Sequence, residues 1–166
     1  MSTPLNDAAL DQLFRAARTR NGWQAKDVPE TLIKAAYELT KMGPTSANGS
    51  PARFLFLRTA EAKARLKPHL MEMNVAKTMS APWAVIVATD MRFHDKMDVL
   101  FPVQPGAGAM FAGMPPEMYA EHALRNASLQ GAYFMLACRS LGLDCGAISG
   151  FDPAGVDKEF FAGDPA

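Results

Sequence analysis

Four short polar stretches of the sequence hold the residue types that could bind a ligand. The densest is GPTSANGSPARF, residues 43–54, where Thr45, Ser46, Asn48 and Ser50 crowd between two apolar segments. Hydroxyl and amide side chains commonly satisfy the backbone of turns, although a single turn needs fewer of them. The stretch therefore fits either a turn or a polar cradle for a ligand that carries several hydrogen-bonding groups.

A second stretch, ARTRNGW at residues 17–23, brings two arginines close together. The guanidinium groups of Arg18 and Arg20 present planar forks of donors that suit a phosphate or a carboxylate. The common alternative is a pair of solvated cations that complement the dipole at the end of a helix. Taken alone, the two arginines favour that alternative.

Two further stretches each offer one feature of interest. In NVAK, Asn74 and Lys77 are one helical turn apart, so an amide and a positive charge share a helix face. In AISGFD, residues 147–152, Gly150 follows a short apolar run and permits close approach of the backbone to a flat ligand. A solvated helix face and an ordinary turn are the simpler interpretations of these two stretches.

The sequence does not indicate other kinds of catalytic or metal site. His69, His94 and His122 are scattered without metal-ligand spacing, and no GxSxG, P-loop or GxGxxG motif is present. Cys138 and Cys145 make neither a disulfide framework nor a zinc site. We expect Cys138 to be buried on a helix, and Cys145 to be reactive only if it is exposed.

The composition suits one domain with a substantial core. The chain has 166 residues, of which 49% are hydrophobic. Lys plus Arg and Asp plus Glu both number 17, so no overall field favours nucleic acid or an anionic membrane. The N-terminus lacks the pattern of a signal peptide, and the apolar runs are too short to span a membrane. We therefore expect a cytoplasmic protein without nucleic-acid or membrane partners.

The elements that would position the polar stretches follow from capping residues and hydrophobic periodicity. Two strands are predicted, at 54–58 and 83–89, and the nearly all-apolar WAVIVAT of the second indicates a central strand covered on both faces. Residues 101–116 are rich in Pro and Gly and are expected to form a long loop. Helices are expected at residues 6–19, 27–42, 60–70 with an interruption at Pro68, 117–141 and 153–161, and helix or irregular turn at 71–80.

The longest predicted helix, residues 117–141, carries a stripe of small residues. Ala123, Ala127 and Gly131 recur at every fourth position and would let another helix come close. The order of elements lacks a regular alternation of strand and helix with a glycine-rich first turn. It predicts an α+β fold, with a small mixed or antiparallel sheet that is flanked by helices.

Taken in their order and spacing, the four polar stretches resemble the FMN-dependent nitroreductase family. The matching features are the arginine pair followed by NGW, the GPTSANxxPxxF loop, NxxK shortly before an apolar strand, and xSGFD after a long helix. The loop and NGW are most similar to the RutE-type branch, the malonic semialdehyde reductases of pyrimidine degradation, also described as NADH dehydrogenase/NAD(P)H nitroreductases. The resemblance covers nearly the whole chain, from the first helix to SGFDPAGVDKEFF.

The resemblance implies an FMN-binding nitroreductase-like fold in a homodimer, with two FMN sites at the subunit interface. Asn21 falls where many relatives carry a basic residue near the flavin ring. The positions that match cofactor residues are Arg18, Thr19 and Arg20 near the phosphate and ribityl chain, Pro44, Thr45, Ser46 and Asn48 in a loop that reaches the other subunit's flavin, Asn74 at the pyrimidine edge with Lys77 nearby, and Ile148, Ser149 and Gly150 against the ring.

The chemistry of FMN agrees with that assignment. Its phosphate, polar tail, hydrogen-bonding ring edge and flat apolar ring require arginine, hydroxyls, an amide and a glycine-flanked backbone. Because the flavin carries the hydride, no catalytic residue of the protein is required and none is predicted. The implied reaction uses NADH or NADPH to reduce malonic semialdehyde to 3-hydroxypropanoate, and Arg125 is the candidate partner of the substrate carboxylate.

Two other functions stay open at the level of sequence. One is a nitro or quinone reductase of broad specificity, and the other is an FMN-binding or structural dimer without activity. The second arises because the family continues with another strand, a GYGD-like segment and a tail, whereas FFAGDPA comes last here. We therefore expect residues 1–166 to form a single FMN-binding domain that lacks that strand and tail.

Overall fold

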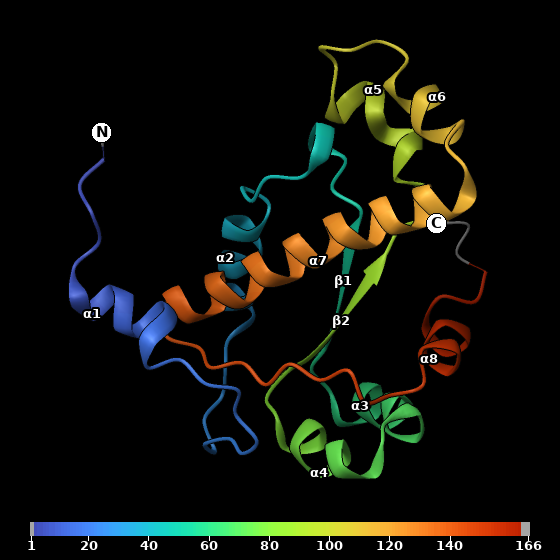
Figure 1. The fold of residues 1–166 in the computed structure, drawn as a ribbon. Coiled ribbons are helices and arrows are strands. Elements are labelled where there is room, and N and C mark those ends of the chain that lie inside the picture. The colour runs from blue at the N-terminus through green and yellow to red at the C-terminus, as the bar shows by residue number, and fades with distance from the viewer. Residues whose placement is uncertain (1, 164–166) are drawn as a thin grey trace.

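A long helix and a two-stranded sheet occupy the middle of the computed structural model, which describes residues 2–163 (Figure 1). The strands β1 (Ala52–Leu57) and β2 (Ala84–Thr89) pair antiparallel, from Ala52↔Thr89 to Leu57↔Ala84. Helix α7 (Pro116–Ser140) passes in front of the sheet in Figure 1. The prediction of an α+β fold with a small antiparallel sheet and flanking helices is confirmed.

The antiparallel pairing gives the sheet two distinct ends. At one end the chain enters β1 and leaves β2, and there the Asp90 N–H donates to the Pro51 carbonyl at 2.8 Å. At the other end lie α3 (Ala60–Leu66) and α4 (Glu72–Ser80), at the bottom of Figure 1. Since β1 has 6 residues, the two ends are separated by about 20 Å.

Two hydrophobic clusters attach helices to the sheet. In the first, Ala36 of α2 (Glu30–Thr40) packs with Phe134 and Cys138 of α7, and the Phe134 ring centroid lies 5.2 Å from that of Phe54 on β1. The second joins β1 to α3 and to α8 (Pro153–Phe160), and its buried members are Leu57, Leu66 and Val156.

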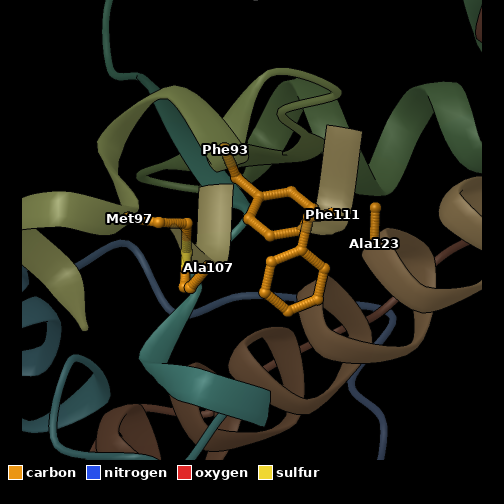
Figure 2. Close-up of a cluster of buried hydrophobic side chains, with 5 residues drawn as sticks. All are labelled: Phe93, Met97, Ala107, Phe111 and Ala123. Atoms are coloured by element: carbon orange, nitrogen blue, oxygen red, sulfur yellow. The ribbon is translucent and has the colours of Figure 1, made fainter. Parts of the chain in front are cut away.

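A third cluster builds the end of the molecule that carries α5 (Met97–Leu100) and α6 (Ala107–Ala112), and Figure 2 shows its buried side chains. The Phe93 and Phe111 rings meet edge to face, with centroids 5.3 Å apart. The expectation of a continuous loop over 101–116 is therefore wrong. Gly106, at φ +85°, turns the chain, and α6 then forms because Ala107 and Phe111 lie one helical turn apart and both pack into this cluster.

The stripe of small residues on α7 permits close approach, but only in part to helices. Ala123 is buried in the cluster of Figure 2, among residues of α5 and α6. At Gly131, however, a Cβ atom would lie 3.7 Å from the Val87 side chain, so a strand covers that position.

Two other expectations differ from the structure. The first helix comprises α1 (Asp7–Leu10) and one wider turn over Asp11–Arg15, so it ends at Arg15 and not near Thr19. The Arg18 guanidinium donates to the Arg15 and Ala17 carbonyls at 2.8 and 2.7 Å, which satisfies the end of the helix.

Strand β2 is the other difference, because it is not a central strand, although helices pack on both of its faces through Val85 and Ile86. Val87 is 45% exposed, and the remaining residues of the strand are only half-buried. The reason is that β1 is the only strand paired with β2 within residues 2–163, so one edge of β2 stays open despite its apolar sequence.

Candidate cofactor site

Three of the four polar stretches meet at the α4 end of the sheet. The Asn74 amide donates through Nδ2 to the Gly150 carbonyl at 2.8 Å, and the Met71 N–H donates to the same oxygen at 3.1 Å. Lys77, one turn further along α4, donates through Nζ to Asn21 Oδ1 at 3.1 Å. These bonds join segments that are far apart in the sequence into one polar cluster.

Gly150 is required at its position by steric constraint. A Cβ atom there would lie 2.6 Å from Asn74 Nδ2 and 3.0 Å from Met71 Sδ. Asn74 is itself 5% exposed, so it has little room to move away. The absence of a side chain lets α4 and the 147–150 segment approach closely, and it leaves backbone atoms at the surface of the cluster.

The arginine segment, residues 17–23, is bonded to the part of the chain that leads to Gly150. The Arg20 N–H donates to the Cys145 carbonyl at 3.0 Å, and Arg20 Nε lies 3.3 Å from Asp144 Oδ2. A Cβ atom on Gly146 would lie 2.4 Å from the Arg20 carbonyl oxygen and 3.2 Å from the Trp23 ring, so this contact too depends on glycine.

Trp23 fixes the other side of the same segment, and sequence reasoning assigned it no role. Its Nε1–H donates to the Lys77 carbonyl at 2.7 Å, which ties the turn after the arginines to α4. The NGW motif was noticeable in the sequence, but only the fold shows that the indole bonds to the same helix that carries Asn74 and Lys77.

Lys63 also supports α4 and was missed by sequence reasoning. Its side chain is buried, and Nζ donates to the Met79 and Ala81 carbonyls at 2.9 and 2.7 Å. A cation at these carbonyls complements the C-terminal end of a helix dipole. Nothing in AEAKARL distinguishes this lysine from its solvated neighbours.

The cations of the cluster remain accessible. Arg18, Thr19 and Arg20 are exposed, Lys77 is half-buried, and Ser149 is exposed beside half-buried Ile148. The arrangement can therefore offer positive charge, hydroxyls and a glycine backbone to an anionic ligand with a flat part.

The GPTSANGSPARF loop lies at the opposite end of the sheet. The Ser46 N–H donates to Asn126 Oδ1 of α7 at 2.8 Å, and the Ser50 N–H donates to Thr45 Oγ1 at 3.1 Å. The Asn48 amide donates through Nδ2 to the Leu100 carbonyl at 2.8 Å. This loop is consequently attached to α7 and α5, whereas Asn74 and Lys77 lie on α4.

The backbone of this loop is strained. Ala47, Asn48 and Ser50 have φ values of +50°, +52° and +43°, in the left-handed region that side chains other than glycine rarely adopt. Such conformations cost on the order of 1–3 kcal/mol each and persist where surrounding contacts impose them. Strain of this kind clusters at functional sites, which favours a binding role for the loop over simple turn chemistry.

Arg53 and Asp90 hold the loop at its junction with the sheet. The buried Asp90 carboxylate pairs with the Arg53 guanidinium, which also donates to the Ser50 carbonyl at 3.0 Å. Asp90 Oδ1 accepts from the Arg92 N–H at 2.7 Å. Both sides of the junction are therefore fixed before any ligand binds.

The structure thus brings one set of predicted site residues together and leaves the other set apart. Asn74, Lys77 and residues 148–150 gather around α4, and Arg20 is bonded to the adjoining residues Asp144 and Cys145, whereas the Arg18 guanidinium is bonded to the end of the first helix. Pro44, Thr45, Ser46 and Asn48 lie about one strand length away, at about 20 Å. Arg125 belongs with the second group, because it is exposed on α7 beside Asn126 and pairs with Glu121.

A large cavity adjoins the α4 cluster. It has a volume of about 1150 Å³ and lies between the open side of β2, α7 and the 141–148 segment, with Arg20, Trp23 and Lys77 in its wall. In the part of the chain that is described, no group of three or more His, Cys, Asp or Glu side chains is arranged to hold a metal ion. The helices within residues 2–163 are too short or too polar to cross a membrane.

Solved structures share this fold. One, from Exiguobacterium sibiricum 255-15 and described as "a putative nitroreductase in complex with FMN", superimposes with a TM-score of 0.81 at 19% identity, over 97% of this chain and 83% of that one. A nitroreductase family protein from Streptococcus pneumoniae TIGR4 gives 0.79 at 19% identity, over 90% and 81%. The architecture is accordingly that of the nitroreductases.

Sequence comparison carries the assignment from fold to family. The "Nitroreductase family" model matches residues 2–162. A "Putative NADH dehydrogenase/NAD(P)H nitroreductase" of Burkholderia lata is 57% identical over 161 residues, which are 97% of this chain and 82% of that protein. A protein of the same description from Stenotrophomonas maltophilia K279a is 56% identical over 163 residues, 98% of this chain and 82% of its own length. The chain belongs to the nitroreductase family of oxidoreductases.

Proposed function

We propose that this protein is an FMN-dependent NAD(P)H oxidoreductase that acts as a homodimer, with FMN bound between two copies. The observation that carries the proposal is the division of the predicted cofactor residues between two ends of one chain. One end offers cations and a glycine backbone, and the other offers a strained, hydroxyl-rich loop. The cytoplasmic location and the single FMN-binding domain over 1–166 stay predictions, and Met1 and residues 164–166 lie outside the described structure.

The residues of the α4 end fit FMN. Arg18, Thr19 and Arg20 would hold the phosphate and the ribityl chain, and Lys77 would add positive charge near the ring. Asn74 would bind the ring edge, and it also fixes the Gly150 carbonyl. The close packing around Gly150 leaves Ile148, Ser149 and Gly150 to meet a flat ring with backbone atoms. When bound, FMN would supply hydride transfer, while these residues hold and orient it.

The distance between the two ends supports a dimeric site. The 44–48 loop cannot reach the α4 cluster of its own chain, because its strained backbone is bonded to α7 and α5. A twofold-symmetric dimer solves this problem, since each copy then gives its loop to the α4 end of the other. Two equivalent sites per dimer follow.

For the substrate we propose malonic semialdehyde, reduced to 3-hydroxypropanoate. Arg125 supports this choice because it is an exposed cation on α7, the helix to which the 44–48 loop is hydrogen-bonded. In the dimer it would therefore lie beside the shared site. There it could pair with the substrate carboxylate in place of Glu121.

A nitro or quinone reductase of broad specificity is the second candidate, and one observation favours it. Val99 and Val103 are 83% and 79% exposed, and Val99 is next to Leu100, whose carbonyl accepts from Asn48. In the dimer an apolar surface would therefore lie next to the loop at the shared site, and this surface would suit planar aromatic electron acceptors.

The absorption spectrum of the purified protein, before and after NADH, tests the proposal. We expect flavin bands at the start, or after reconstitution with FMN, and bleaching of those bands by NADH or NADPH. Comparison of kcat/KM for malonic semialdehyde, a nitroaromatic compound and a quinone then separates the two candidate reactions. A protein that binds FMN but oxidises no nicotinamide would instead support a dimer without activity, and failure to bind FMN would refute the proposal.

A further inference from the structure

Two cysteines on neighbouring segments line the same cavity, and the proposed flavin site uses neither. Cys138 lies on the last part of α7 and is 4% exposed, whereas Cys145 follows the turn after α7 and is half-buried. Both side chains contribute to the wall of the cavity beside β2. Cys145 also packs against the buried cluster that contains Cys138.

The reversal of the chain after α7 brings the two thiols together. Gly142 has a φ of +78°, and the Leu143 N–H donates to the Cys138 carbonyl at 2.9 Å. This is the hydrogen-bond pattern that ends a helix and sends the chain back along it. Cys145 thereby returns towards the end of α7 and packs against the buried cluster that contains Cys138, with its Sγ 4.0 Å from the Met135 carbonyl oxygen.

The surroundings make the two sulfurs chemically unequal. The neighbouring Cys138 thiol lowers the pKa of the Cys145 thiol, with help from the nearby charge of Arg139 and against the effects of burial and Asp144. The neighbouring Cys145 and burial raise the pKa of Cys138. Cys145 is therefore the sulfur that ionises and attacks, and Cys138 is the thiol that resolves.

We infer that Cys138 and Cys145 form a dithiol oxidation site that takes a peroxide and closes to an intramolecular disulfide. The Cys145 thiolate attacks one oxygen of hydrogen peroxide, the O–O bond breaks, and the products are a sulfenic acid and hydroxide. The Cys138 sulfur then displaces the sulfenic oxygen, which leaves as water. In sum, two thiols lose two electrons and two protons, and one peroxide becomes two waters.

The position of the dithiol links it to the arginine segment. The Cys145 carbonyl accepts from the Arg20 N–H, and Asp144 pairs with the Arg20 guanidinium. Movement of Cys145 towards Cys138 would act on these contacts directly. The cavity gives a small oxidant access to both sulfurs, although Cys138 is buried from bulk solvent.

Peptide mapping of the whole protein after mild peroxide treatment tests the inference. Trypsin cleaves after Arg125, Arg139 and Lys158, so Cys138 and Cys145 fall in the separate peptides 126–139 and 140–158. We expect treatment of the reduced protein to remove both free thiols and to join these two peptides in a product that a reductant splits. The protein should run as a single chain on a non-reducing denaturing gel.

Matched serine variants supply the controls. In Cys138→Ser the oxidation should stop at a sulfenic acid on Cys145 that dimedone labels. In Cys145→Ser the Cys138 thiol should be lost at least about tenfold more slowly than in the wild type, because it lacks thiolate character. The inference is overturned if the wild type keeps the Cys138 thiol while Cys145 oxidises to sulfinic or sulfonic acid, or if the disulfide joins two chains. These wild-type outcomes hold even where a variant fails to fold.

Discussion

The α4 end of the molecule and the 44–50 loop end are both polar, but they are held in different ways. At the α4 end, ordinary backbone is brought together by long-range hydrogen bonds from Asn74, Lys77 and Trp23, and by the absence of a side chain at Gly150. At the loop end, contacts with neighbouring segments hold the backbone of Ala47, Asn48 and Ser50 in a left-handed conformation. The first depends on packing space, and the second on anchors that hold strained dihedral angles.

This difference suggests that the two ends of the molecule have different roles in binding. A region built on close approach of backbone suits a flat ligand and has little tolerance for added volume. A strained loop that is anchored in advance loses little entropy when it meets a ligand or another subunit. Changes at the two ends should consequently fail in different ways.

The largest effect is expected for Gly150→Ala. The new Cβ would collide with Asn74 and Met71, so FMN affinity should fall by about 100-fold or more and the free energy of unfolding by about 1–3 kcal/mol. FMN fluorescence titration and urea unfolding measure the two quantities. Gly22→Ala is the control, because nothing lies within 4 Å of its added Cβ. Equal losses in both variants would contradict the steric interpretation.

Removal of a positive charge at the α4 end should change FMN binding without changing stability. Lys77→Ala removes a cation and its bond to Asn21, and we expect about a tenfold rise in the Kd for FMN with little change in unfolding. Lys34→Ala, which removes an exposed lysine paired with Glu30 on α2, should leave the Kd unchanged. An unaltered Kd in the Lys77 variant would remove this residue from the proposed site.

At the loop end, Asn126→Ala should act mainly on stability. It leaves the Ser46 N–H without its partner, and the loss of a buried hydrogen bond costs about 1–3 kcal/mol of unfolding free energy. Ser128→Ala, two residues along α7, removes only an exposed bond to the Leu124 carbonyl and should cost less than about 0.5 kcal/mol. Urea unfolding of both variants makes the comparison, and equal losses would argue against a loop held by its anchors.

The smallest effect is expected at Asn48, where backbone strain can be separated from the side chain. Asn48→Ala loses the bond to Leu100 and places alanine in a left-handed conformation, which should lower the unfolding free energy by about 1 kcal/mol. Asn48→Gly loses the same bond without the strain, so it should be the more stable of the two. Both should weaken FMN binding while the core stays folded, and loss of the fold would return Asn48 to a purely structural role.

The sequence revealed local features better than distant contacts. Capping residues and periodicity located most helices and both strands within a few residues, because those properties are local. The α6 helix was missed, since Gly and Pro around it suggest a loop and only burial of Ala107 and Phe111 makes it helical. The exposure of β2 was also missed, because an apolar strand does not show how many neighbours it has.

The residues of the candidate site show the same contrast between local features and distant contacts. Asn74, Lys77 and Gly150 were singled out from short motifs, and the structure brings them together. The roles of Trp23 and Lys63 could not be predicted, because each depends on carbonyls that only the tertiary fold places within reach. The separation of the 44–48 loop from α4 likewise needed the pairing of β1 with β2.

Complementation between two defective variants tests most directly whether the two ends meet across a dimer. One variant carries Lys77→Ala with Gly150→Ala, and the other carries Thr45→Ala with Asn48→Ala. After denaturation and joint refolding, random pairing should put one intact site into each mixed dimer, so FMN binding should return to about a quarter of the wild-type capacity. If the mixture binds no more FMN than the two variants refolded separately, the loop does not complete the site of another copy.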